Sequence, residues 1–303
     1  MKILCFGSLN IDYTYRVPHF VRPGETLAAA SLARYSGGKG LNQAIALARA
    51  GAPVFMAGAI GEDGRFLLEE LQTAGVDTQR VCIRSEERTG HAIIQNESGG
   101  DNCILLYGGA NRTITQAQIA EVLADFSAGD YLLLQNEINA LPYLMEQAHQ
   151  KGMKLCLNPS PMEQSVLKLP LAQVDYFLLN RGEAEQLLAE ENGCRTPEQL
   201  LQELRQKFPG AGLVLTLGDK GAWYADAEEC FLQPACPAEA VDTTGAGDTF
   251  TGFFLAALMQ GQAPRQAMAQ AARAAAIAVS RRGAAPSIPT LAEVQAAMEK
   301  THD

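Results

Sequence analysis

Residues 240–252, AVDTTGAGDTFTG, place three residues with almost no side chain directly before a carboxylate and an apolar helix. The pattern predicts the end of a strand, a tight turn, and a helix that Asp248 opens. The N–H groups of Gly245, Ala246 and Gly247 can come close to an anion, and a helix N-terminus adds roughly half a positive charge. The stretch therefore predicts an anion site beside a carboxylate.

Asp248 has two possible roles. An acid at this position is expected to stay ionised, which suits a general base, and a phosphate cradle beside a base is what a kinase of small hydroxyl compounds needs. The alternative is a glycine turn in which Asp248 is an ordinary helix N-cap.

Composition narrows the possible partners. The chain has 303 residues, 47% of them hydrophobic, enough for the large core of one α/β domain. A formal net charge of −10 argues against nucleic acid or an anionic membrane surface as partner. A nucleotide substrate stays possible, because phosphate sites are built locally. With no run of about 18 apolar residues and no signal-peptide pattern, we expect a cytoplasmic protein.

Apolar runs alternate with amphipathic stretches along most of the chain, which predicts a mostly parallel sheet with helices on both faces. Expected strands lie at residues 2–7, 54–59, 131–135, 154–157, 176–179 and 213–217, followed by a hairpin at 223–225 and 230–233. Expected helices lie after the glycines of 36–51, at 61–74, 115–124, 139–150, from about 182, and at 197–207, 248–260, 264–280 and 290–300.

Two regions do not follow this alternation. Residues 13–35 read as extended segments and turns, and residues 79–84, 90–96 and 103–107 read as strands with few helices around them. We expect the last three to form a small antiparallel unit over the main sheet.

Polar residues follow many of the expected strands, where ligands bind in open parallel sheets. Each one alone could be a turn residue, but together they predict a site at one edge of the sheet. They are Asn10, Asp12, Glu137, Asn158, Asn180, Glu183, Thr216, Gly218 and the segment 242–248.

Two common nucleotide-binding motifs are absent. Lys39 follows glycines, but Gly40 comes next and the G-x-x-x-x-G-K-[ST] spacing is missing. No G-x-G-x-x-G follows the first strand, which disfavours a dinucleotide-dependent dehydrogenase. The glycines of 37–40 are interpreted instead as a place where a substrate meets backbone, with Lys39 and Asn42 in reach. The alternative is a flexible hinge before a helix.

Four stretches together carry a resemblance to a known family: GGKGLNQA (37–44), LTLGDKGAW (215–223), AVDTTGAGDTF (240–250) and AVSRRGAAPSIP (278–289). On these the chain is identified as a member of the ribokinase family of PfkB-type carbohydrate kinases, over essentially its whole length. The resemblance implies one domain over 1–303 with a three-layer α/β/α fold, a mostly parallel central sheet and a small β-lid. The lid segments would be about 11–35 and 88–110.

The resemblance also implies roles for individual residues. Asp248 would take the proton from a sugar hydroxyl, and Gly245, Ala246 and Gly247 would form the anion hole for the phosphoryl group. The implied sugar ligands, besides Asp248, are Asn10, Asp12, Gly38, Lys39, Asn42 and Glu137. The implied ATP site comprises Asn180, Thr216, Gly218, Asp219, Gly221 and Gly247. Asn180 and Glu183 would organise Mg²⁺ and phosphate, and a monovalent cation, K⁺ by preference, would be held by Asp242, Thr244, Ala278, Arg281, Gly283 and Ser287.

The implied reaction is ATP-dependent phosphorylation of a sugar hydroxyl, with D-ribose to D-ribose 5-phosphate as the first hypothesis and a homodimer formed through the lid. A second hypothesis is another sugar, such as fructose, or a nucleoside. A third is a sugar- or nucleotide-binding regulator without catalysis, against which the intact GAGD stretch weighs.

Some positions depart from the family's usual pattern. They are Leu41 in the first glycine stretch, His91 in a lid strand, Arg112 after Gly109-Ala110-Asn111, and Arg181 and Gly182 between Asn180 and Glu183. They leave the sugar open rather than the reaction. Arg112 could meet a substrate anion or be a solvated loop residue.

Overall fold

The computed structural model describes residues 1–97, 99, 101–188 and 195–300. Its main sheet has the order β13-β12-β11-β10-β9-β8-β1-β4-β5. In this order, every neighbouring pair from β11 across to β5 is parallel. Strands β12 and β13 are antiparallel and form one edge of the sheet. The strands are β1 (Ile3–Phe6), β4 (Val54–Gly61), β5 (Asp77–Arg84), β8 (Tyr131–Gln135), β9 (Lys154–Asn158), β10 (Tyr176–Asn180), β11 (Gly212–Thr216), β12 (Ala222–Ala225) and β13 (Cys230–Gln233).

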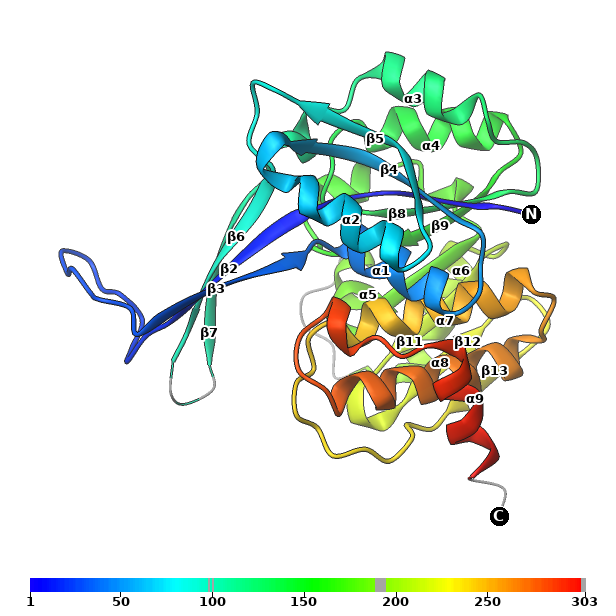
Figure 1. The fold of residues 1–303 in the computed structure, drawn as a ribbon. Coiled ribbons are helices and arrows are strands. Elements are labelled where there is room, and N and C mark those ends of the chain that lie inside the picture. The colour runs from blue at the N-terminus through cyan, green and yellow to red at the C-terminus, as the bar shows by residue number, and fades with distance from the viewer. Residues whose placement is uncertain (98, 100, 189–194, 301–303) are drawn as a thin grey trace.

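Helices cover both faces of this sheet, as the alternation predicted (Figure 1). One face carries α1 (Lys39–Arg49), α2 (Arg65–Thr73), α7 (Ala246–Met259), α8 (Pro264–Val279) and α9 (Leu291–Glu299). The other carries α3 (Gln116–Leu123), α4 (Leu141–Gln150), α5 (Arg181–Leu187) and α6 (Pro197–Lys207). Short 3₁₀ turns lie at Glu62–Gly64, Gly109–Arg112, Gln164–Lys168, Leu171–Gln173, Gly218–Lys220 and Ala285–Ser287. None of the described helices has both the length and the apolar character needed to cross a bilayer.

The sequence of strand β1 is apolar throughout because the strand is covered on both faces. Ile3 and Cys5 belong to the core under α1 and α7, whereas Leu4 and Phe6 belong to the core under α3 and α4. Successive side chains of a strand point to opposite faces, so a strand covered on both sides has no polar position.

A second sheet, the lid sheet, projects from the body of the molecule (Figure 1). It has the order β3-β2-β6-β7, with β2 (Asn10–Arg16), β3 (Ser31–Gly37), β6 (Gly90–Asn96) and β7 (Asn102–Tyr107). The described elements thus form a three-layer α/β/α fold with a small β-lid, the predicted fold class.

The expectation of one antiparallel unit from residues 79–84, 90–96 and 103–107 is confirmed for β6 and β7, which pair antiparallel, and is wrong for β5. Strand β5 belongs to the main sheet, parallel to β4, and β6 pairs in parallel with β2. Residues 65–73 supply the crossover helix that parallel β4 and β5 require. Period-two alternation identifies a strand but not its partner, which is why the sequence alone misassigned β5.

Helices α1 and α7 lie in direct contact because Gly252 has no side chain. A Cβ atom at Gly252 would lie 2.4 Å from Ala46 Cβ and 2.7 Å from the Leu47 backbone nitrogen, both on α1. These distances are well below van der Waals contact. The close approach brings the first turn of α1 against the first turn of α7.

Replacing Gly252 with Ala should therefore destabilise the protein, although alanine favours helix by about 1 kcal/mol. Overpacking costs about 1–3 kcal/mol, and backbone atoms cannot move aside as a flexible side chain can. We expect the free energy of unfolding in urea to fall by about 1 kcal/mol or more. Gly210→Ala, at a position with open space around it, is the control and should be neutral. Greater stability of the Gly252 variant would contradict the packing described here.

Candidate functional site

The N-terminus of α7 is formed by the glycine turn that the sequence predicted. Gly245 is the N-cap, with φ of 75°, and its α-carbon faces Ala284, so the turn needs a residue without a side chain. Ala246 and Gly247 are the first two helical residues, and Asp248 is the third. No side-chain bond caps the helix, so Asp248 is not an N-cap and the alternative interpretation of this residue is wrong.

The Asp248 carboxylate instead faces α1. Its Oδ1 accepts a hydrogen bond from Gln43 Nε2 at 2.8 Å, and its Oδ2 accepts one from Asn42 Nδ2 at 3.1 Å. Burial raises the pKa of Asp248 above the ordinary aspartate value, while the positive charge of Lys39 and the two amide donors oppose that rise. The net direction is upward, so these three neighbours offset only part of the effect of burial on the pKa of Asp248.

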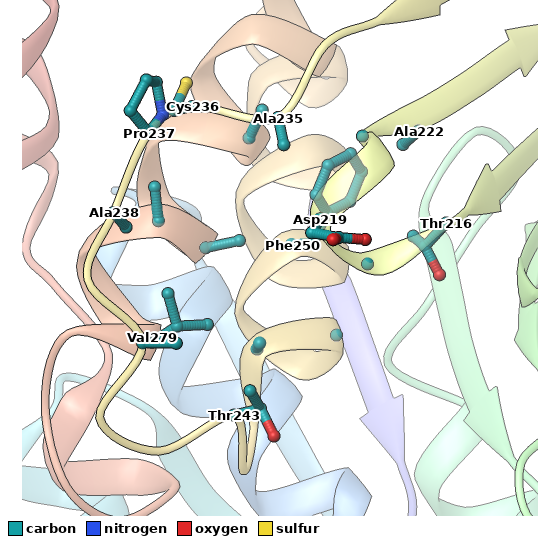
Figure 2. Close-up of a pocket in the computed structure, with 18 residues that line it drawn as sticks. Thr216, Asp219, Ala222, Ala235, Cys236, Pro237, Ala238, Thr243, Phe250 and Val279 are labelled. Carbon is teal, nitrogen blue, oxygen red and sulfur yellow. The ribbon is translucent and has the colours of Figure 1, made fainter.

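Two pockets meet at this helix. The larger, of about 660 Å³, is bounded by Thr216 and Asp219 on one side and by Pro237, Ala238 and Val279 on the other (Figure 2). It contains five of the six predicted ATP-site residues, namely Thr216, Gly218, Asp219, Gly221 and, from the α7 turn, Gly247. Much of its lining is apolar, which suits a flat heterocycle.

The smaller pocket, of about 150 Å³, is polar and is lined by Lys39, Asn180, Glu183 and Asp248, among others. Thr216, Gly247 and Phe250 line both pockets. An elongated ligand could therefore lie with its apolar end in the larger pocket and its polar end near Asp248.

Glu137 joins the glycine-rich start of α1 to the turn after β1. Its carboxylate accepts hydrogen bonds from the Ser8 hydroxyl and, at 2.9 Å, from the Lys39 backbone nitrogen. The Gly40 backbone nitrogen donates to Ser8 Oγ at 3.2 Å. Ser8 is thus a member of the site that the sequence analysis missed, because one serine in a Gly-Ser-Leu turn carries no pattern.

Asn10 and Asp12 stand on β2 where the lid sheet leaves the body. Asn111 Nδ2 donates to Asn10 Oδ1 at 2.7 Å. A Cβ at Gly90 would lie 2.1 Å from Asn111 Nδ2, and one at Gly37 would lie 2.2 Å from Asp12 Oδ2. Burial, with a smaller contribution from the negative charge of Glu137, raises the pKa of Asp12 to about 6. These polar groups therefore fit closely against lid backbone, and Asn111 is another member that the sequence analysis missed.

Asn180 and Glu183 form a capping box at the start of α5. Asn180 Oδ1 accepts from the Glu183 backbone nitrogen, and Glu183 Oε2 accepts from the Asn180 backbone nitrogen, each at 2.9 Å. The N-x-x-E spacing thus has a structural role. Glu183 is nevertheless buried at the smaller pocket, and its Oε1 is not used in the box.

The residues expected to hold a monovalent cation come from two segments tied together by Asp242. Its carboxylate accepts from the backbone nitrogens of Thr244 at 2.9 Å and Gly283 at 2.8 Å. The Val279 carbonyl accepts from the Asp242 nitrogen at 3.1 Å. Arg281, by contrast, directs its guanidinium to Glu293 at 2.6 Å, so only its backbone could serve a cation. Of the other two, Ala278 lies buried near the end of α8, and the buried Ser287 donates its hydroxyl to the Ala284 carbonyl.

Four of the residues that depart from the family pattern are a core leucine, a histidine packed on rings and two arginines bonded to protein groups. Leu41 is fully buried, and His91 packs against the rings of Tyr13 and Tyr107. Arg112 is exposed and donates to the Ile138 carbonyl, as expected of a loop residue, and Arg181 pairs with Glu185 on the surface.

Comparison with known proteins supports this description. Residues 1–291 match the pfkB family carbohydrate kinase model. A ribokinase from Haemophilus influenzae is 35% identical over 294 residues, which cover 95% of each protein. The structure of Arabidopsis thaliana ribokinase complexed with ribose and ATP superposes with a TM-score of 0.86 and 29% identity over 97% of each chain. A deoxyribokinase from Salmonella typhi is 29% identical over 96% of each protein.

The matches extend over almost the whole chain, and the buried carboxylate, glycine turn and paired pockets all lie within the matched residues. The protein is therefore a ribokinase-like phosphotransferase, and the chain belongs to the PfkB family of carbohydrate kinases.

Proposed function

We propose that the protein transfers the γ-phosphoryl group of ATP to D-ribose, giving D-ribose 5-phosphate and ADP. The observation that carries the proposal is the buried Asp248 carboxylate, which lines the polar pocket next to Gly247, a residue that the polar pocket shares with the apolar one. The similarity of the protein to a ribokinase whose structure is complexed with ribose and ATP supports the choice of both substrates.

In this proposal Asp248 accepts the proton of the attacking hydroxyl as the new oxygen–phosphorus bond forms. The bond between the γ-phosphorus and the bridging oxygen breaks, and its electron pair leaves with ADP. The N–H groups of Gly245, Ala246 and Gly247 would stabilise the charge on the transferring group, because they are placed before the reaction begins. Lys39 adds a positive charge close to the same point.

The larger pocket would hold the nucleotide, with Asp219 and Thr216 toward its polar end and the glycines Gly218, Gly221 and Gly247 against backbone. Asn180 and Glu183 would hold a hydrated Mg²⁺, since Glu183 keeps one carboxylate oxygen outside the capping box. When bound, Mg²⁺ would neutralise charge on the phosphates.

The sugar would lie between α1 and the lid sheet. Hydroxyls need partners when buried, and Asn42 Oδ1 is a buried acceptor without one. Asn10, Asp12 and Glu137, with the backbone of Gly38 and Lys39, complete the proposed sugar site. Because one relative is a deoxyribokinase, the second candidate substrate is a related sugar or a nucleoside.

A screen for ADP release identifies the acceptor. We expect D-ribose to give the highest kcat/KM among pentoses, 2-deoxyribose, fructose and nucleosides, because the polar groups of the site match several hydroxyls. An analogue lacking one bonded hydroxyl should lose about tenfold or more. A nucleoside or hexose that clearly exceeds D-ribose would overturn the proposed substrate and leave the kinase reaction standing.

Replacing Asp248 with Asn tests the base. We expect kcat to fall about 100-fold or more, since general base catalysis contributes at least that much, with little change in ATP or sugar affinity. The fold should survive, because asparagine has the size of aspartate and the substitution removes a buried charge. Single-turnover rates and a urea unfolding curve measure both effects, with Asp125→Asn as a surface control. Near-normal turnover would remove Asp248 as the base.

A monovalent cation is proposed beside the α7 turn. Asp242 and neighbouring carbonyls are hard oxygen donors, which suit K⁺. The ion would link the 242–245 segment to the 278–287 segment and so steady the anion hole.

Exchange of Na⁺ for K⁺ at constant ionic strength should therefore raise kcat several-fold. The Asp242→Ala variant should lose this response, because the anchor of both segments is gone. Asp226→Ala, which removes a carboxylate elsewhere, should keep it. Identical rates of the wild type in Na⁺, K⁺ and a large organic cation would exclude the site.

A homodimer through the lid sheet is also proposed. Its edge strand β7 exposes Ile104 to 56%, Leu105 to 68% and Tyr107 to 52%, and β3 exposes Leu32. Exposed apolar edge strands of this kind are usually covered by a partner.

Light scattering at micromolar concentration should give twice the mass of the chain. The double variant Ile104→Lys and Leu106→Lys, both on one face of β7, should give a monomer. Leu232→Lys, on the exposed edge of the main sheet, is the matched control and should remain a dimer. A monomeric wild type would contradict the proposed assembly.

A further inference from the structure

Two buried glutamines form a hydrogen-bonded chain that ends on Asp248. Gln135, at the end of β8, donates from Nε2 to Gln43 Oε1 at 2.6 Å. Gln43, on α1, donates from Nε2 to Asp248 Oδ1 at 2.8 Å. Both glutamine side chains are fully buried. None of the family-implied roles described above uses either of them.

The chain has a direction that Gln135 imposes. Because Gln135 presents its NH₂ group to the Gln43 oxygen, the NH₂ group of Gln43 must face the carboxylate. The Gln135 Nε2 also donates to Cys5 Sγ at 3.8 Å, and its Oε1, which has no hydrogen-bond partner, lies over Gly7, where a Cβ would be 2.1 Å away. Without Gln135, the Gln43 amide could turn and direct its oxygen toward Asp248, which would disfavour the ionised carboxylate.

The charged and titratable groups around Asp248 show why a donor from Gln43 matters for the protonation of this carboxyl. Lys39 on α1 is the nearby cation, and it also interacts with Glu137 and Glu183. Cys5 on β1 is a buried neutral thiol, with its pKa raised to about 12 by burial. Burial alone would favour a protonated Asp248, which could not accept a proton from a hydroxyl.

We propose that Gln43, oriented by Gln135, is a positioning residue that keeps the Asp248 carboxylate ionised and fixed toward the smaller pocket. The inference rests on the proposed role of Asp248 as the base. It assigns to Gln43 a task separate from that of its neighbour Asn42, which has an acceptor left for substrate.

The test compares Gln43→Met, Gln43→Glu and Gln135→Met with the wild type. Single-turnover ADP formation is followed from about pH 5 to about pH 9, and the carboxyl carbon of Asp248 is titrated by ¹³C NMR, with its signal assigned through Asp248→Asn. Gln270→Met is the control, since it removes a buried amide from α8, the helix packed on α7.

Loss of a donor to a carboxylate should raise its midpoint by about one pH unit. In Gln43→Met both the acid limb of the rate and the NMR midpoint should move up by that amount, with the rate recovering to within a few-fold at high pH. Gln43→Glu should move them further, because a second carboxylate faces the first. Gln135→Met, which does not touch α7, should give a smaller shift in the same direction, and Gln270→Met none.

A wild-type NMR midpoint in a folded Gln43→Met protein would overturn the proposal, as would a rate loss equal at every pH. If Gln43→Met does not fold, Gln135→Met decides by the same criterion. The two proposals fail in different ways: normal turnover of Asp248→Asn refutes the base, whereas an unshifted midpoint refutes the role of Gln43 even if Asp248 is the base.

Discussion

The contact between the first turns of α1 and α7 is the constraint on which the site depends. It exists because Gly252 lets the two helices approach, and it buries a carboxylate among amide donors. A carboxylate in such a place would be costly without them, since an unpaired buried charge is strongly disfavoured. The helix packing therefore also determines the surroundings of Asp248: the α1 residues that bury its carboxylate also donate hydrogen bonds to it.

A second cluster of polar groups, formed by Asp12, Glu137 and Ser8, lies where the lid sheet leaves the body. Asp12 and Glu137 lie near each other in a partly buried setting, and the pKa of Asp12 rises to about 6. Glu137 is held by the Ser8 hydroxyl and by a backbone nitrogen at the start of α1. Gly37 lets lid backbone pass directly against Asp12, and Gly90 lets it pass against Asn10 and Asn111. Polar side chains and bare backbone thus lie directly against each other where the lid sheet leaves the body.

Much of the fold could be predicted from the sequence, because its helices are strongly amphipathic and its buried strands are continuous apolar runs. Residues 197–207 were predicted with their observed bounds. The partner of β5 could not be predicted, since pairing depends on the whole sheet rather than on local pattern. Whether Asp248 is the N-cap also needed the structure, because a one-turn difference in where the helix begins decides which way the carboxylate points.

The site residues that escaped prediction share a property: Ser8, Asn111 and Gln135 form hydrogen bonds to other protein groups. Their partners lie roughly 30 to 130 residues away along the chain, and a single polar residue at the end of a strand does not reveal such a partner. Gln43 lies within the first glycine-rich motif, next to Asn42. The sequence therefore placed it near the site but did not show which group its side chain contacts.

The residues around the two pockets and the lid come from elements far apart in the sequence, which affects how such a protein can evolve. Asn10 and Asp12 stand on a lid strand, whereas Asp248 and the glycine turn stand on a helix at the far end of the sequence. Mutations can therefore reshape the lid side of the site over evolutionary time without disturbing the carboxylate. Helix α1 is the exception, because Asn42 and Gln43 touch that carboxylate directly. Diversification within such a scaffold is thus expected to begin in the lid and to reach α1 last.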